Sequence, residues 1–401
     1  MRISTQQFFQ RSSQSMGDTQ RTLLEAQQRL ATGQQRLSSS ENPGNAQASL
    51  RLTARIEQLD RFARAQDAAE ARLNLEDSTL GALTNNLQRV RELALMLGNP
   101  TLTESDTLGI QAELRSLKEE AVSLANTAAP TGEALFGGTS ASAKAFSVAT
   151  DGTVTYEGTD SARRLQLGEG RPLTVSTPGD ELFQAIPDLN PLRATAGDGN
   201  TGTAVFDVPE IADDVAYSAA ALPLSVTFNG DGTVDLTDSA APPVTTTGLA
   251  IEDESLTVAG ITVAFSGTPE AGDTLTLAAP ADRSLFAVYD AVLAAAEAPR
   301  STAAERAAFE NKLRSAQDGL EAAEVQVNGA RGSVGARLAS LNSERTVQEG
   351  TRLELEAQRS AIDDLDYTAA ITEFQQQLTA LQAAQSAFTR LSDLSLFNFL
   401  R

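Results

Sequence analysis

Oxygen-bearing side chains alternate in one short stretch of this sequence, and their spacing makes them the first candidates for chemistry. Asn229, Asp231, Thr233 and Asp235 stand two residues apart, like the first ligands of a calcium-binding loop. Such a loop also needs a bidentate carboxylate at its twelfth position, where this sequence has Ala240. A tight turn between two strands is therefore the favoured interpretation, and calcium binding by this segment stays an alternative.

The composition removes most catalytic and metal-binding groups. The 401 residues include no His, no Cys and no Trp. The usual ligands of zinc, copper and iron–sulfur clusters are thus absent, as are His general bases and Cys nucleophiles. We expect no cofactor, no metal site and no enzymatic activity. Without Cys the chain has no disulfide framework.

Acidic residues dominate the middle of the chain. The net charge is −22, and residues 137–283 alone hold 21 acidic and 6 basic residues. Such a surface argues against nucleic acid as a partner, because phosphate binding needs cations. The sequence has no apolar run of the roughly 18 residues that span a bilayer, and its start lacks the apolar block of a cleaved secretory leader. We expect neither a nucleic-acid nor a membrane partner.

A heptad pattern begins close to the N-terminus. Large apolar residues stand seven apart, each of the first three followed after three residues by a small one, which is typical of a coiled-coil seam. The large residues are Met16, Leu23, Leu30 and Leu37. The segment 38–45 then breaks the pattern, because Pro43 followed by glycine disfavours a helix interior.

Longer helices follow this break and return near the C-terminus. The pattern predicts a helix over about 46–97 and an antiparallel partner from the capping sequence at 103–106 to about 128. Another long helix is predicted over about 301–360. A last apolar stripe, again with heptad spacing, consists of Ile371, Phe374, Leu378, Leu381 and Phe388.

The middle segment has the alternation of β-strands. Residues 225–238 and 254–267 each predict a hairpin. We therefore predict an α+β multidomain protein, with a long helical coiled coil or bundle built from the N- and C-terminal segments and an inserted β-rich domain. The predicted parts are terminal coiled-coil assembly segments at 1–45 and 366–401, a helical rod at 46–136 and 284–365, and a variable β-rich insert at 137–283.

The terminal segments are expected to be disordered in the free monomer. Burying each large seam residue contributes roughly 1.5–3 kcal/mol. Ordering each residue of the backbone costs about 1–2 kcal/mol. Four anchors over the twenty-odd residues of a helix with one wet face do not offset that cost, so these segments should order against each other and then against neighbouring molecules.

Glycines interrupt the long C-terminal helix. Gly329, Gly332 and Gly335 each cost about 1 kcal/mol in a helix relative to Ala. Propensity alone therefore predicts a break near these residues.

Two motifs resemble the bacterial flagellin superfamily. The N-terminal motif lies in QQRLATGQQRLSSSENPGNA, and the C-terminal motif lies in ARGSVGARLASLNS. The positions that carry the resemblance are Leu30, Thr32, Gly33, Pro43, Arg331, Gly335, Ala336 and Arg337. In this superfamily the glycine-containing segment is a continuous helix, so the resemblance implies that the break predicted from propensity does not occur.

The resemblance implies a structural protein of the bacterial flagellum. The opening Met-Arg-Ile-Ser and the ending Leu-Phe-Asn-Phe-Leu are similar to the branch that joins hook to filament. The implied partners are further copies of the chain in a ring, a neighbouring hook-associated protein, flagellin and an export chaperone that binds the C-terminal region. The implied location is extracellular, reached through the flagellar type III apparatus without a cleaved signal. A self-polymerising filament flagellin and an adhesive role of the insert stay alternatives.

Overall fold

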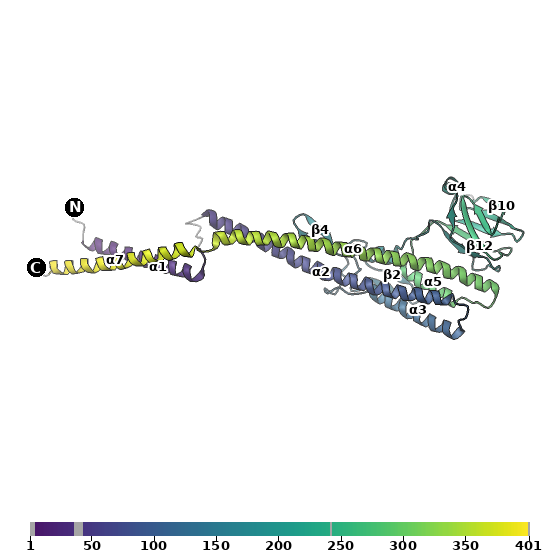
Figure 1. The fold of residues 1–401 in the computed structure, drawn as a ribbon, viewed down its shortest axis with the longest axis horizontal. Coiled ribbons are helices and arrows are strands. Elements are labelled where there is room, and N and C mark those ends of the chain that lie inside the picture. The colour runs from purple at the N-terminus through teal and green to yellow at the C-terminus, as the bar shows by residue number, and fades with distance from the viewer. Residues whose placement is uncertain (1–4, 36–42, 241–242, 400–401) are drawn as a thin grey trace. The chain divides into compact units, whose positions relative to one another are not determined.

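The computed structural model describes residues 5–35, 43–240 and 243–399, and it divides into two compact units (Figure 1). The first unit comprises residues 1–64 and 344–401, and the second comprises residues 65–343. The helices are α1 (Thr5–Thr32), α2 (Pro43–Leu97), α3 (Glu104–Ala125), α4 (Asp214–Ala219), α5 (Leu285–Glu297), α6 (Ala303–Asp363) and α7 (Tyr367–Phe399). A π-helical turn, η1, covers Asp180–Gln184.

The strands are short and lie between α3 and α5 in the sequence. They are β1 (Phe146–Val148), β2 (Val154–Tyr156), β3 (Arg164–Gly168), β4 (Arg171–Thr174), β5 (Arg193–Ala196), β6 (Val205–Phe206), β7 (Glu210–Ile211), β8 (Leu224–Phe228), β9 (Thr233–Thr237), β10 (Thr245–Ala250), β11 (Ser255–Val258), β12 (Ile261–Ser266) and β13 (Thr274–Ala278). The combination of long terminal helices with a β-rich insertion confirms the predicted α+β class.

In the first unit, α1 and α7 lie side by side and run in opposite directions (Figure 1). In the start of α2, Ile56 and Leu59 are buried, at 6% and 7% exposed, and the Ser49 hydroxyl donates to the Asp363 carboxylate at the end of α6. An ion pair of 3.3 Å between Arg352 and Asp60 joins the same two helices. Since two paired helices have no third element to cover them, most apolar side chains of this unit stay partly exposed.

In the second unit, α2, α3, α5 and α6 share one apolar core. Hydrogen bonds from Asn86 to Glu120 and from Arg89 to Glu113 join α2 and α3, so these helices are antiparallel as predicted. Thr103 caps the start of α3: its hydroxyl accepts from the Asp106 amide while the Asp106 carboxylate accepts from the Thr103 amide. This reciprocal cap satisfies two amides at the start of the helix.

Four phenylalanines connect the segment after α3 to the helical core. Phe136, Phe146, Phe183 and Phe286 are fully buried, and their ring centroids lie 5.1–6.0 Å from their neighbours. Segment 146–186 therefore packs as part of the rod. A separate core begins at Leu192 and ends at Leu277, inside the stretch predicted as the insert.

The inserted domain consists of antiparallel strands whose side chains alternate between core and surface. One sheet has the order β10-β9-β8-β13-β5, and another has the order β11-β12-β6 with β7 also pairing with β12. Both hairpins predicted from the sequence, β8–β9 and β11–β12, are present. Along β12 every second residue is buried, which is the period of a strand with one dry face.

The helix α6 continues through its glycines, so the break predicted from propensity is wrong and the continuous helix implied by the resemblance is correct (Figure 1). Leu320, Val327, Val334 and Leu341 stand seven residues apart on either side of these glycines. All four are at most 1% exposed. Burial of such anchors, roughly 1.5–3 kcal/mol each, exceeds the helix cost of about 1 kcal/mol for each glycine.

Candidate assembly site

The predicted N-terminal seam lies on the face of α1 that meets α7. Met16, Leu23 and Leu30 are half-buried there, and Ala26 between them is 4% exposed. Leu37 lies outside the described residues. Among the described seam residues only Ala26 is buried, because a pair of two helices covers a large side chain on one side alone.

The C-terminal stripe divides into two faces of α7. Phe374, Leu381 and Phe388 are half-buried and alternate with Ala370, Gln377 and Ala384, which gives a regular seam toward α1. Ile371 and Leu378 instead lie one residue outside this seam and are 46% and 38% exposed. The structure therefore brings three of the five predicted residues into the pair and leaves two on its apolar flank.

The N-terminal family motif ends α1. The Thr32 hydroxyl donates to the carbonyl of Gln28 in the last turn, and Gly33 follows with a φ of +70°. A positive φ after the last helical residue is the usual glycine position of a helix end. Pro43 is the first residue of α2, where its missing amide hydrogen is not needed.

The C-terminal family motif connects α6 to α2. Arg331 Nε lies 3.3 Å from Oδ1 of Asp77, an ion pair that is partly exposed. Arg337 donates to the Thr177 hydroxyl at 3.0 Å and lies 4.0 Å from a carboxylate oxygen of Glu76. Gly335 and Ala336 between the two arginines are exposed. The arginines of the motif are therefore packing residues of the rod.

Glu76 is the most deeply buried acid in this region. Its side chain is 0% exposed, and burial raises the pKa of its carboxyl, while the guanidinium groups of Arg337 and Arg72 act in the opposite direction. Sequence reasoning missed Glu76, because a single acid inside a helical pattern has the same appearance on a wet face and in a core.

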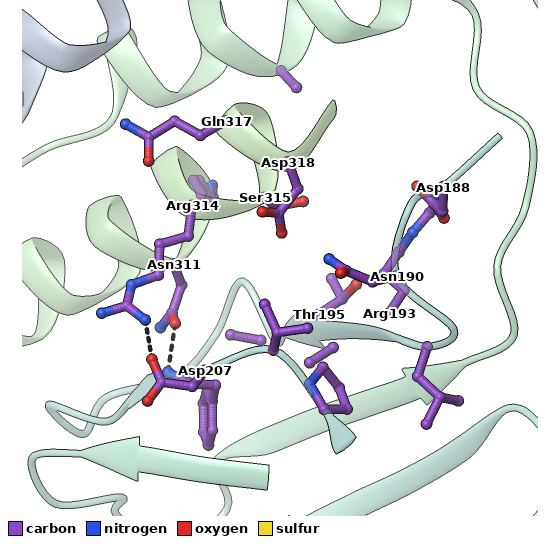
Figure 2. Close-up of a pocket in the computed structure, with 18 of the residues that line it drawn as sticks. Asp188, Asn190, Arg193, Thr195, Asp207, Asn311, Arg314, Ser315, Gln317 and Asp318 are labelled. Carbon is purple, nitrogen blue, oxygen red and sulfur yellow. Dashed lines mark hydrogen bonds and ion pairs between the residues drawn. The ribbon is translucent and has the colours of Figure 1, made fainter. Parts of the chain in front are cut away.

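The neck of the inserted domain is tied by polar contacts. Ile186 and Arg283, where the chain enters and leaves the domain, exchange backbone hydrogen bonds of 3.0 and 2.9 Å. Asp188 pairs with both Arg193 and Arg283. Asp188, Arg193 and Arg283 line an open cavity of about 580 Å³ between the insert and α6 (Figure 2).

Helix α6 also holds the edge of strand β6. Asn311 donates to the Ala204 carbonyl at 2.9 Å and accepts from the Phe206 amide at 2.9 Å, so its side-chain amide pairs with the strand as another strand would. Arg314 pairs with the neighbouring Asp207, as Figure 2 shows. The cations that line this cavity are paired with carboxylates of the same cavity.

The candidate calcium residues lie in the β8–β9 turn and at the start of β9. Asp231 accepts from the amide and hydroxyl of Thr233, and Asn229 donates to Thr233 and Asp235. The hydrogen bonds from Thr233 lower the pKa of Asp231. Within the described residues no group of three or more acids could hold a metal ion. In the same part of the chain, no helix has the length and apolar character needed to cross a membrane.

Two regions of the sequence match models of bacterial flagellin. Residues 3–141 match the N-terminal helical region of bacterial flagellin, and residues 317–400 match its C-terminal helical region. Together these regions cover more than half of the chain. The chain belongs to the bacterial flagellin family. The resemblance seen in the two motifs is thereby confirmed.

Similarity to members of the flagellin family extends beyond these regions. The chain is 21% identical to "Flagellar hook-associated protein 3" of Salmonella typhimurium, with 100% of both chains covered. It is 27% identical to "Flagellin D" of Vibrio cholerae, over 79% of this chain and 83% of that protein. The crystal structure of Xanthomonas campestris FlgL matches with a TM-score of 0.69 and 27% identity, over 77% of this chain and 99% of FlgL.

Proposed function

We propose that this flagellin-family chain is a structural component of the flagellum that forms the junction between hook and filament. The observation that carries this proposal is the match to Flagellar hook-associated protein 3 along the full length of both chains. A filament flagellin is the second candidate, since Flagellin D matches over most of its length. The family is structural, and the paired charges of the neck cavity fit a protein without catalysis.

The flank of the terminal helix pair is the surface that meets neighbouring subunits. Ile371 and Leu378 stand seven residues apart on one face of α7, and Leu24 of α1 is 64% exposed. Exposed apolar side chains at helical spacing gain burial when another helix covers them. The seam residues hold α1 to α7, and the flank residues hold this pair to further copies, to a hook-associated protein and to flagellin.

Order in the terminal segments depends on these neighbours. The large seam residues Met16, Leu23 and Leu30 are only half-buried in the α1–α7 pair, so their burial offsets less of the ordering cost than a closed core would. We expect limited proteolysis of the purified monomer to remove about residues 1–45 and 365–401 first. Equal resistance of the termini and the rod to the protease would contradict the expectation that the termini become ordered only beside neighbouring subunits.

Terminal segments that become ordered only after assembly are also suited to export. An N-terminal segment that stays unfolded can pass through the flagellar type III apparatus, and a cytoplasmic chaperone would cover the C-terminal region before export. The protein then acts outside the cell as part of the flagellum.

Deletion of residues 371–401 tests the junction role. The second unit, residues 65–343, has its own cores and should still fold, while the strain should fail to attach filaments to hooks. Normal attachment would overturn the proposal. To separate the two candidates, purified protein is added to filament seeds: long filaments indicate a flagellin, and a short terminal layer indicates a junction protein.

A further inference from the structure

Two helix ends are tied together inside the first unit. The residues that follow α1 and those that link α6 to α7 form a short antiparallel bridge, centred on Gln34 and Asp364. The Gln35 amide donates to the Asp363 carbonyl at 2.8 Å, and the Leu365 amide donates to the Gly33 carbonyl at 3.0 Å. The end of α1 and the start of α7 are therefore held together at one point.

A side chain closes on the glycine at this point. Tyr367, the first residue of α7, covers Gly33 so closely that a Cβ at residue 33 would lie 2.7 Å from the phenolic oxygen. The backbone of Gly33 also has a φ of +70°, which disfavours any L side chain. The positive φ and the nearby phenolic oxygen thus both favour glycine here, and the contact lies at the end of the α1–α7 pair.

The heptad spacing of α1 does not by itself define the register of the pair. The large residues of α1 recur every seven positions, so a slip of one heptad, about 10 Å along the axis, places similar residues opposite α7 again. The ion pair between Arg29 and Glu373 is long, at 3.9 Å, and partly exposed, so it discriminates weakly between registers.

We infer that the Gly33–Tyr367 contact and the Gln34–Asp364 bridge set the register of the terminal helix pair. They are positioning residues: they determine which heptad of α1 faces which heptad of α7. The register decides where Leu24 lies relative to Ile371 and Leu378, and hence the shape of the apolar flank. That consequence for assembly rests on the proposed function, whereas the register itself does not.

Disulfide trapping in purified full-length protein tests this inference, because the chain has no Cys of its own. Ala26 lies three residues before Arg29, and Gln377 lies four residues after Glu373, so the observed register brings Ala26 and Gln377 together. The double variant Ala26→Cys/Gln377→Cys reports this register. Ala26→Cys/Ala384→Cys reports a slip of one heptad.

Each cysteine pair is then combined with substitutions at the Gly33–Tyr367 contact, which we call the lock. Gly33→Ala introduces the colliding Cβ. Gly33→Ala with Tyr367→Phe removes the oxygen that it meets and keeps the ring. Gly17→Ala is the matched control, because it lies in the same helix with no atom within 4 Å of the added Cβ. Tyr367→Ala removes the contact without straining the backbone, should Gly33→Ala fail to fold.

With the native lock we expect the 26/377 pair to cross-link at least ten times faster than the 26/384 pair. Gly33→Ala, which also strains the backbone of the bridge, should bring this ratio close to one. Tyr367→Ala leaves the bridge in place and should lower the ratio without abolishing it. Tyr367→Phe should partly restore the ratio in the Gly33→Ala protein, and Gly17→Ala should leave it unchanged. A ratio near one with the native lock, no cross-link in either pair, or a ratio that Gly33→Ala leaves unchanged would overturn the inference. The measurement uses isolated protein, so a failure of the junction role in cells does not alter it.

Discussion

Arg337 of α6 places its guanidinium 4.0 Å from a carboxylate oxygen of Glu76 on α2, and the Glu76 side chain is fully buried. Six residues earlier, Arg331 reaches the adjacent acid, Asp77, on a partly exposed surface. The motif therefore supplies two ion pairs between α6 and α2, one with a buried carboxylate and one that is partly exposed. The difference in burial predicts different energies for the two pairs.

Removal of either arginine charge measures this difference. Arg337→Met removes one of the two guanidinium groups that act on the buried Glu76 carboxylate, which should lower the free energy of unfolding by about 3 kcal/mol at pH 8. Arg331→Met removes a partly exposed pair and should cost about 1 kcal/mol or less. Urea denaturation of both variants checks this order. Equal losses would show that burial of Glu76 does not control the energy of the pair.

The stability of the rod should depend on pH through Glu76. Burial raises the folded-state pKa of Glu76 above its unfolded value of about 4.3, so the folded state holds the proton more tightly. The contribution of this group is fully present below the unfolded pKa and is lost as pH rises through the folded pKa. Glu76→Gln should therefore gain stability relative to the native chain as the pH increases.

Melting curves of Glu76→Gln and the native protein at pH 4, 6 and 8 provide the measurement. The difference in melting temperature between the two proteins should grow in favour of Glu76→Gln across this series. A constant difference would mean that the pKa of Glu76 is the same in the folded and unfolded chains.

Exposed glycines of α6 can be replaced with a gain in stability. No atom lies within 4 Å of a Cβ at Gly332 or Gly335, so alanine fits there and improves helix propensity by about 1 kcal/mol. Gly319→Ala is the contrasting variant, because its Cβ would lie 3.3 Å from Val288. Thermal unfolding should rank Gly332→Ala and Gly335→Ala above the native protein. A loss of stability in both would indicate that these positions are not open.

Asn311 should hold the inserted domain to α6. Asn311→Ala leaves the Phe206 amide and the Ala204 carbonyl without their partner, at a cost of about 1–3 kcal/mol. Hydrogen exchange at the Phe206 amide should accelerate. Lys312→Ala removes only an exposed ion pair with Asp198 and should leave this exchange unchanged. Equal protection of the Phe206 amide in both variants would contradict the role of Asn311 in holding β6 to α6.

The sequence contained the long-period features of this fold, because heptads and strand alternation repeat over many residues. It predicted the antiparallel α2–α3 pair and both hairpins, whereas the assembly role of Met16, Leu23 and Leu30 stays a prediction. Propensity gave a wrong break at Gly329–Gly335, because local cost does not include the burial of Val327 and Val334. The two motifs, in contrast, pointed to the correct family and to a continuous helix.

Contacts between residues far apart in sequence could not be predicted. Tyr367 covers Gly33, and Asn311 pairs with strand β6, yet the spacing of residues in the sequence identifies neither partner. The sequence also did not show which apolar residues of α7 face α1 and which lie on the flank. Core positions of a heptad are three or four residues apart, so Ile371 with Phe374 fits the pattern as well as Ala370 with Phe374. Only the packing of α7 on α1 distinguishes the two.

The most direct test of the junction role uses the exposed flank of α7 and leaves the fold intact. A strain that lacks the native protein receives Ile371→Asp/Leu378→Asp, with Val215→Asp on exposed α4 as the control. Electron microscopy then counts the hooks that carry filaments. The account predicts bare hooks with the double variant and normal filaments with the control. Normal filaments with Ile371→Asp/Leu378→Asp would contradict it.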